Sequence, residues 1–310
     1  MEQRVITILG GTGFLGRYVV KRLANEGFRL RVVARNPSDA LELNTSGHVG
    51  QIALIAGDIT KPESYAAALT GSYAVINLVG ILFERGKQNF TAVHSLGAEK
   101  LAIAAKAAGA ERFIQISALG VEHEFGSSYA RSKFLGERAV AMAFPEATII
   151  RPSILFGAED NFFNKFAKMA NISPALPLIG GGRTLFQPVY VDDIARAIEI
   201  CLSRNDTKGE VYELGGPQVY NFKQILEYIL AVTGKNRKLV ALPFSVASLI
   251  GRLGEHCPTP PLTRDQVKLL KYNNTTNPDL KSFAHLGITP TAMEFIVPEY
   301  LSIFSKKAAA

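Results

Sequence analysis

Tyr129 and Lys133, in the segment SSYARSKFLGE, have the residue types and the spacing of a proton-transfer pair. Residues four positions apart face the same side of a helix. An ammonium near a phenol favours the phenolate, so Tyr129 is predicted to act as a general acid or base beside Lys133. Tyr-x-x-x-Lys is common by chance, and the prediction therefore depends on the segments that come before it.

Three glycines near the start of the chain, Gly10, Gly13 and Gly16, follow one predicted strand and open a predicted helix. In this spacing the first glycine permits a tight turn, the second lets the backbone approach a pyrophosphate, and the third allows close helix–strand packing. Free N–H groups at the helix start meet the phosphate charge. The predicted dinucleotide-binding residues of this turn are Gly10, Thr12, Gly13, Phe14, Leu15 and Gly16.

Arg35 ends the second apolar run, at a position where an acidic residue would accept hydrogen bonds from a free ribose 2′-hydroxyl. A guanidinium there favours a 2′-phosphate instead. The predicted cofactor is therefore NADP(H) rather than NAD(H), and the alternative is a solvated loop arginine. The ends of the next two strands are expected to flank the adenine, through Asp58 and Ile59, and the ribose, through Val79 and Gly80.

The elements that must position these residues alternate between strands and helices. Short β-branched runs lie at 4–9, 30–34, 52–56, 74–79, 113–117 and 148–151, separated in several cases by Ala-rich helical segments, of which 94–110 is the clearest. This alternation predicts a parallel sheet covered on both faces. The expected fold is α/β, a Rossmann-type doubly wound sheet with a smaller C-terminal α/β lobe. Residues 1–155, with 186–215 returning to them, are expected to bind the dinucleotide, and 156–185 with 216–310 to form the smaller lobe.

Composition and charge limit the classes of protein to which the chain can belong and the kinds of site that it can contain. A chain of 310 residues with 47% hydrophobic residues can bury a large core. The two cysteines and five histidines are scattered, so we expect no metal site, no disulfide framework, and histidines at the surface or at helix caps. The net charge of +7 comes without a basic segment carrying interleaved aromatics, which argues against nucleic acid. We expect no signal peptide, no membrane span and a cytoplasmic location.

The motifs together resemble the extended short-chain dehydrogenases/reductases, the NAD-dependent epimerase/dehydratase group. GGTGFLG, GDIT, YARSK, RPSILFG and PVYVDDIARA stand in that group's order. The stretch from ERAVAMAFPEATII onward and PLTRDQVKLL look like the atypical branch typified by the nucleotide-binding accessory subunit of respiratory complex I. The resemblance implies tightly held NADPH, Lys133 on the nicotinamide ribose, and the backbone after Pro152, at Ser153 and Ile154, over the nicotinamide. It also implies complex I subunits or quinone-related enzymes as partners, and a peripheral place on the inner face of a bacterial plasma membrane.

One departure from the family pattern concerns the third catalytic residue. Active members carry a Ser or Thr one or two residues beyond the first serine after the fifth strand, whereas QISALG supplies Ser117, Ala118 and Leu119. Ser117 can substitute only if the loop shifts; otherwise it bonds locally. Two functions stay open: an NADP(H)-binding complex I accessory-subunit homologue whose cofactor is mainly structural or regulatory, and an active NADPH-dependent reductase, epimerase or dehydratase using Tyr129 and Lys133. A nucleotide-sensing regulator would resemble the first.

Three further features are assigned mainly to structure. Asp192 is expected to cap an amphipathic helix, with Asp193 adding charge in its first turn. Arg183, in a glycine-rich loop, is a candidate for contact with an anionic substrate; the alternative is an ordinary surface arginine. The segment PFSVASLIGRLGE has an apolar stripe through Val246, Leu249, Ile250 and Leu253 within a basic region. We expect that helix to pack on its own lobe; the alternative is contact with an anionic membrane or a partner protein.

Overall fold

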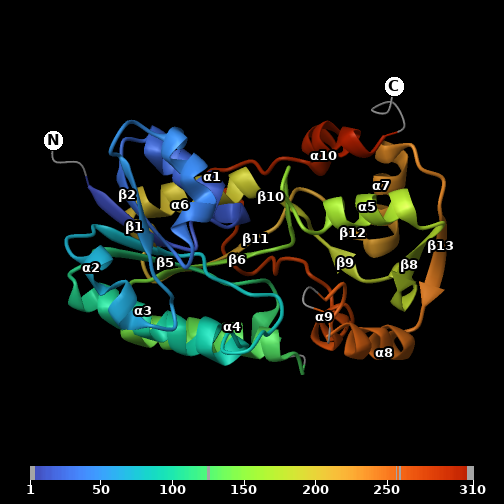
Figure 1. The fold of residues 1–310 in the computed structure, drawn as a ribbon, viewed down its shortest axis with the longest axis horizontal. Coiled ribbons are helices and arrows are strands. Elements are labelled where there is room, and N and C mark those ends of the chain that lie inside the picture. Colours follow the sequence, from blue (N-terminus) through green and yellow to red (C-terminus); the bar gives the residue numbers. More distant parts are fainter. Residues whose placement is uncertain (1–3, 124–125, 256, 258–259, 306–310) are drawn as a thin grey trace.

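A computed structural model describes residues 4–123, 126–255, 257 and 260–305. A large sheet covered by helices forms the left part of Figure 1, and a smaller α/β lobe forms the right part. The strands are β1 Val5–Leu9, β2 Arg29–Ala34, β3 Ile52–Ala56, β4 Ala74–Asn77, β5 Arg112–Ile116, β6 Thr148–Pro152, β7 Leu155–Phe156, β8 Ala175–Ile179, β9 Leu185–Phe186, β10 Val189–Tyr190, β11 Val211–Leu214, β12 Tyr220–Asn221 and β13 Lys238–Leu242. The α-helices are α1 Phe14–Asn25, α2 Ala66–Leu69, α3 Gly97–Ala107, α4 Ser128–Ala143, α5 Phe163–Ile172, α6 Val191–Ser203, α7 Phe222–Thr233, α8 Phe244–Gly254, α9 Arg264–Leu269 and α10 Met293–Leu301.

The large sheet is parallel throughout, with the strand order β11-β6-β5-β4-β1-β2-β3. β1 is an inner strand, with Ile6 opposite Leu30 of β2 on one side and opposite Ala74 of β4 on the other. The order therefore reverses between β1 and β4. In open α/β sheets, ligands bind at the carboxyl ends of the strands beside such a reversal.

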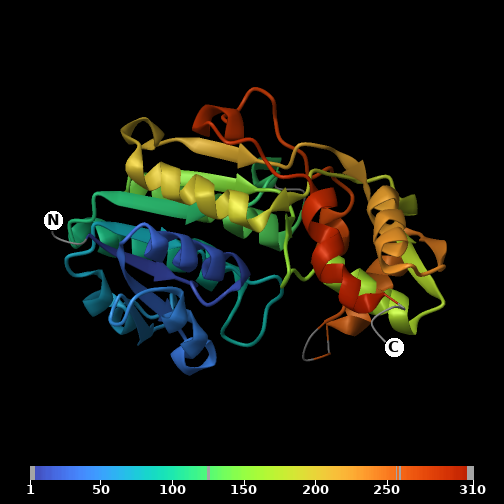
Figure 2. The same ribbon diagram turned by 90° about the horizontal axis from the view of Figure 1, so that it is seen from above.

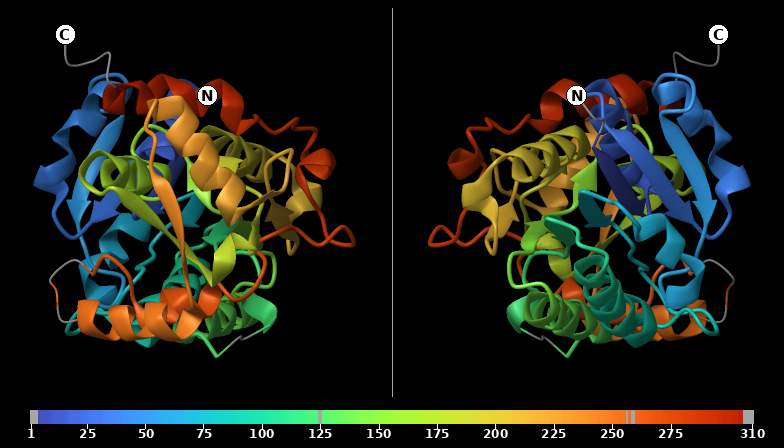
Figure 3. Two further views of the ribbon diagram at one scale, coloured as in Figure 1. Left: turned by 90° about the vertical axis from the view of Figure 1, so that its right-hand side faces the viewer. Right: turned by 90° about the vertical axis from the view of Figure 1, so that its left-hand side faces the viewer.

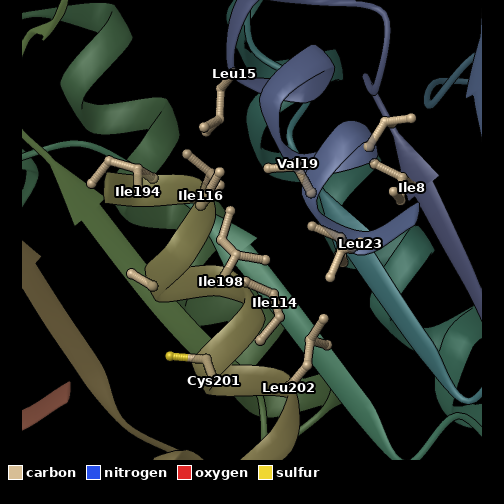
Figure 4. Packing of buried hydrophobic residues seen from close by; sticks show 14 of the residues in the cluster. Ile8, Leu15, Val19, Leu23, Ile114, Ile116, Ile194, Ile198, Cys201 and Leu202 are labelled. Atoms are coloured by element: carbon tan, nitrogen blue, oxygen red, sulfur yellow. The ribbon is translucent and has the colours of Figure 1, made fainter. Parts of the chain in front are cut away.

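Helices cover both faces of this sheet because its strands are apolar on both sides. In β1, Ile6 and Ile8 belong to the core beneath α1 and α6, whereas Leu9 belongs to the core beneath α3 and α4. Figure 2 shows α1 and α6 side by side over one face. Figure 4 shows how they meet the sheet, with these labelled side chains interdigitating: Ile8, Leu15, Val19, Leu23, Ile114, Ile116, Ile194, Ile198, Cys201 and Leu202. The expected Rossmann-type fold is confirmed.

The smaller lobe has its own core. β8 and β13 pair in parallel at the outer edge, and α5, α7 and α10 bury aromatic and aliphatic side chains against them. α8 lies at the margin of this core: Ala247 is part of it, and Phe244 packs against it partly buried, while the fully buried residues of the helix are Ala247 and Gly251. The helix therefore packs on its own lobe, as expected, but it does so through its small residues and Phe244; the predicted apolar stripe of Val246, Leu249, Ile250 and Leu253 faces solvent. In the described part of the chain, no helix has the length and hydrophobicity needed to cross a bilayer.

Local details differ from the sequence expectations at three places. The sheet has a seventh strand, β11, which was not anticipated. The helix expected at 94–110 starts as a π-helical turn over Thr91–Leu96 and continues as α3, followed by Gly109 at φ +79°. Asp192 is not the cap of its helix, because α6 already begins at Val191. Asp192 instead accepts a hydrogen bond from Arg22 at 2.6 Å.

Candidate active site

The turn between β1 and α1 needs all three glycines for separate reasons. Gly10 has φ +80°, a conformation that side chains with a Cβ disfavour. A Cβ at Gly16 would lie 2.5 Å from the Gly10 carbonyl oxygen and 2.5 Å from Gly11 Cα, so only glycine lets α1 approach the turn this closely. Gly13 occupies the cap position of α1 and brings no side chain to it. Phe14 and Leu15 begin the helix. Because no side chain of Gly13 caps α1, the first backbone amides of this helix can donate to an anionic ligand.

A cavity of about 440 Å³ lies beside this turn and contains two guanidinium groups. It is lined by Thr12, Arg17, Ala34, Arg35, Asn36 and Asp39. Arg35 follows β2 as expected, and Arg17 comes from the first turns of α1, where it pairs with Glu42. Sequence reasoning missed Arg17, although its position four residues after Gly13 is a usable signal. The donors in this cavity suit an adenosine ribose carrying a phosphate.

The next two strands end in tight turns held by side chains. Asp58 accepts hydrogen bonds from the Thr60 amide at 2.9 Å and from the Gln88 side chain at 3.2 Å, and Ile59 is buried beside α3. After β4, the Val79 amide donates to Asn77 Oδ1 at 3.1 Å, which ends the strand two residues earlier than expected. The chain then reaches Gly80, where an added Cβ would lie 3.4 Å from Lys133 Nζ.

Lys133 and Tyr129 lie on α4, at the carboxyl edge of the sheet. Lys133 is buried and donates from Nζ to the Ile116 carbonyl oxygen at 3.1 Å. Burial lowers the pKa of Lys133 to about 8, against the opposing charge of Glu137. Burial also raises the pKa of the Tyr129 phenol to about 12. Desolvation therefore acts opposite to the effect expected of the lysine alone, and Tyr129 is a protonated donor at neutral pH.

Ser117 follows β5 directly, next to the carbonyl that Lys133 contacts. Its side chain is buried, with 4% of its surface exposed. Its hydroxyl oxygen finds no hydrogen-bond partner among the residues that the structure describes. The expected local hydrogen bond is thus missing within those residues, and a buried hydroxyl without a partner is unfavourable unless a ligand supplies one.

His94 was expected at the surface or a helix cap, and this is wrong. It is 2% exposed, and its Nε2 accepts a hydrogen bond from the Ile81 amide at 2.9 Å. The proton is therefore on Nδ1, which lies 2.9 Å from Ser132 Oγ. Ser132 in turn donates to the Tyr129 carbonyl oxygen at 2.8 Å. Burial and the charge of Lys133 lower the pKa of His94 to about 2, so the ring stays neutral.

The Tyr129 ring is fixed by two aromatic neighbours. Its centroid lies 5.3 Å from that of His94 and 5.8 Å from that of Phe90, both edge to face. Phe90 and His94 stack on one another at 5.5 Å. Such pairs orient a phenol without consuming its hydroxyl.

The smaller lobe supplies the residue that caps the Tyr129 helix. Asp265 of α9 accepts from the amides of Ser128 and Tyr129, at 2.8 and 3.0 Å, and from Ser127 Oγ at 2.7 Å. Lys268 donates to the Gly126 carbonyl oxygen at 2.8 Å. A carboxylate at a helix start satisfies free amides and complements the helix dipole. The sequence showed no sign of this contact.

A second contact between the two parts fixes the backbone after β6. Asn274 Oδ1 accepts from Ser153 Oγ at 2.7 Å and from the Ile154 amide at 3.1 Å. Pro152 ends β6 at the same edge of the sheet. Arg183, by contrast, is exposed in the loop after β8.

Comparison with known proteins decides the family. Residues 6–215 match the NAD dependent epimerase/dehydratase family. The chain belongs to this family. A mitochondrial relative from Mus musculus, NADH dehydrogenase [ubiquinone] 1 alpha subcomplex subunit 9, is 36% identical over 293 residues, covering 94% of this chain and 78% of its own. Ceramide reductase from Caulobacter vibrioides is 33% identical over 242 residues, covering 77% and 74%.

A solved member of the short-chain dehydrogenase/reductase superfamily from Agrobacterium tumefaciens, with bound NAD, superposes with a TM-score of 0.72 at 21% identity, covering 99% of this chain and 98% of its own. At that identity the likeness concerns the fold alone. The resemblance drawn from the motifs, including the complex I accessory subunit, is confirmed. In this epimerase/dehydratase-family chain, the glycine turn, the arginine cavity and the Tyr129 helix all lie at one edge of one sheet.

Proposed function

We propose that this chain binds NADP(H) across the carboxyl edge of its large sheet. The observation that carries the proposal is the cavity beside the glycine turn, in which Arg17 and Arg35 supply two cations. The α1 amides would hold the pyrophosphate, and Arg35 the 2′-phosphate. Residues 1–155 with 186–215 would carry the dinucleotide, and 156–185 with 216–310 the substrate or partner. When bound, such a cofactor supplies or accepts a hydride.

The main role that we propose is that of a complex I accessory-subunit homologue with a mainly structural or regulatory cofactor. The 36% identical mitochondrial subunit supports it. A bound dinucleotide stabilises the folded form by mass action, which couples nucleotide supply to assembly even without turnover. Partners would be complex I subunits or quinone-related enzymes, and the location peripheral, on the inner face of a bacterial plasma membrane.

A second candidate function is an NADPH-dependent reductase, with epimerase or dehydratase chemistry as variants. The specific observation is the buried Ser117 hydroxyl, which has no hydrogen-bond partner among the described residues and directly follows the Ile116 carbonyl that Lys133 contacts. Tyr129, protonated at neutral pH, would give its proton to a substrate oxygen that Ser117 polarises. Lys133 would hold the nicotinamide ribose. The relation to a ceramide reductase makes a carbonyl on a lipid the first substrate to try.

One experiment separates the two roles. The purified protein is denatured, the released nucleotide is identified by mass spectrometry, and oxidation of NADPH is followed with a panel of ketones, lipid ketones and quinones. Persistent NADPH absorbance across the panel supports the structural role. Rapid oxidation that is abolished by Tyr129→Phe, and kept by the matched variant Tyr220→Phe in the smaller lobe, establishes the reductase. Release of no pyridine nucleotide, with no measurable affinity for one, refutes both.

A further inference from the structure

Helix α8 exposes four large aliphatic side chains and buries the small residues Ala247 and Gly251. Val246, Leu249, Ile250 and Leu253 repeat at intervals of three and four residues, so they form one stripe. Their surfaces are 43%, 58%, 44% and 66% exposed. We call these four residues the α8 face. Singly exposed apolar side chains are ordinary, but a continuous stripe of this kind marks an interaction surface.

The opposite side of α8 explains why the helix is held in this orientation. A Cβ added at Gly251 would lie 2.8 Å from the Arg264 amide nitrogen and 2.9 Å from the Thr263 carbonyl carbon. Ala247, one turn earlier, is fully buried. Small residues thus let α8 pack closely on α9, and the bulky residues cannot turn inward without separating the two helices.

The segment of the sequence that contains α8 is rich in basic residues. Residues 235–272 contain seven Lys or Arg and two acids, Glu255 and Asp265. Glu255 pairs with Arg264 at 3.1 Å, and Asp265 caps α4. α8 itself carries Arg252 and no acid. An apolar helix face in a segment with an excess of basic residues is typical of helices that lie in the interface of an anionic bilayer.

The size of the α8 face favours lipid over a second copy of the chain. Four partly exposed aliphatic side chains offer a few hundred Å². A stable protein interface needs about 800 Å² from each partner. A bilayer requires no complementary shape, and a single amphipathic helix is sufficient to reach it.

We propose that the α8 face inserts into the surface of an anionic phospholipid bilayer. The proposal names the surface that touches the membrane. It rests on the proposed function only for the peripheral location. Figure 1 and the left view of Figure 3 place α8 at the lower edge of the molecule, on the side of α3 and α4. The helix on which α8 packs, α9, is the one whose Asp265 contacts the start of the Tyr129 helix.

The test is vesicle flotation of the full chain without nucleotide. One set of vesicles holds phosphatidylcholine alone and the other equal parts of phosphatidylcholine and phosphatidylglycerol. We expect binding to the mixed vesicles that weakens with added salt. The double variant Leu249→Glu with Leu253→Glu should bind these vesicles at least about tenfold more weakly than the original chain. The matched variant Ile172→Glu, at an 87% exposed apolar position on α5, should bind like the original chain.

Each outcome decides the proposal. Loss of binding in the double variant, with retention in Ile172→Glu and unchanged circular dichroism in both, supports it. No binding of the original chain to mixed vesicles, or equal loss in both variants, overturns it. A dimer that the double variant converts to a monomer, measured by light scattering without vesicles, would assign the α8 face to a second copy instead. Dinucleotide affinity is measured separately, so failure of the proposed function is a distinct result.

Discussion

The Nδ1 atom of His94 lies 2.9 Å from the hydroxyl oxygen of Ser132, and this contact joins the π-helical turn before α3 to the helix that carries Tyr129. Through Nε2 the same ring holds the Ile81 amide. One neutral imidazole thereby sets the distance between a segment expected to face the ribose and the proposed proton donor.

Replacing His94 with Phe should keep the stacking on Phe90 but leave the Ile81 amide without its acceptor, whereas Ser132 keeps its hydrogen bond to the Tyr129 carbonyl oxygen. Because a buried polar group left unpaired costs about 1–3 kcal/mol, we expect the free energy of unfolding to fall by about that amount. Urea unfolding measures it. The control, His48→Phe at an exposed position, should change it by less than about 0.5 kcal/mol.

His94 also predicts a pH dependence. Its pKa is about 2 in the folded chain and 6.5 for an ordinary histidine. Between these values the unfolded chain binds the proton and the folded chain does not, so stability falls as the pH falls below about 6.5, by up to about 1.4 kcal/mol per pH unit. His94→Phe lacks this contribution. The stability difference between the original chain and the variant should therefore narrow on acidification; a constant difference would contradict the assignment.

Arg35→Asp tests the 2′-phosphate assignment. Loss of a charged hydrogen-bond donor and introduction of repulsion should weaken NADPH binding by about 10–100-fold. NADH, which lacks that phosphate, should change by less than about threefold. Titration calorimetry gives both affinities. Arg29→Asp, at the opposite end of β2, is the matched control. Equal losses for both nucleotides would show that Arg35 contacts something else.

Replacing the second and the third glycine of the turn with alanine should affect stability and dinucleotide affinity differently. Gly16→Ala places a methyl 2.5 Å from backbone atoms that cannot move aside, so it should lower stability by about 3 kcal/mol. Gly13→Ala meets only the Gly10 carbonyl oxygen, at 3.3 Å, and should change stability by about 1 kcal/mol or less. It should still reduce dinucleotide affinity more than about tenfold, because its methyl blocks the approach of a pyrophosphate. Normal affinity in Gly13→Ala would refute the phosphate assignment.

Asp265→Ala should remove the carboxylate that the smaller lobe supplies to the first amides of α4. Removing a charged acceptor from a helix start costs about 1–3 kcal/mol. Hydrogen exchange should accelerate at the Ser128 and Tyr129 amides and stay unchanged at the far end of α4. Asp265→Asn, which keeps an acceptor, should show a smaller effect, and Asp279→Ala at an exposed position none. Unaltered exchange at Tyr129 would mean that the helix is capped by its own Ser127 alone.

Much of the large sheet could be predicted because its signals are local. The run 4–9 and the three glycines after it specify a strand, a turn and a helix within a few neighbours along the chain. β11 was missed because its four residues, Val211–Leu214, include a buried Glu213 that breaks the apolar run. That carboxylate is stabilised by Arg151 and by the Asn277 amide, partners that are distant in sequence.

The contacts that complete the candidate site could not be predicted from the sequence, because they too join residues that are distant along the chain. A histidine gives no sign in the sequence that its two nitrogens will both be hydrogen-bonded, so His94 was assigned to the surface. Asp265 reads as an ordinary helix-start acid of α9. Its role at Tyr129 depends on how the two lobes dock, which no periodicity encodes.

The position of Asp265 in the sequence also determines when the start of α4 can be capped during synthesis of the chain. It is translated 136 residues after Tyr129, whose amide it holds. Strands and helices of the sheet can assemble as they leave the ribosome. The beginning of α4 receives its carboxylate only after α9 has emerged and docked. A nascent chain would therefore form the glycine turn well before the first amides of α4 gain this acceptor from the smaller lobe.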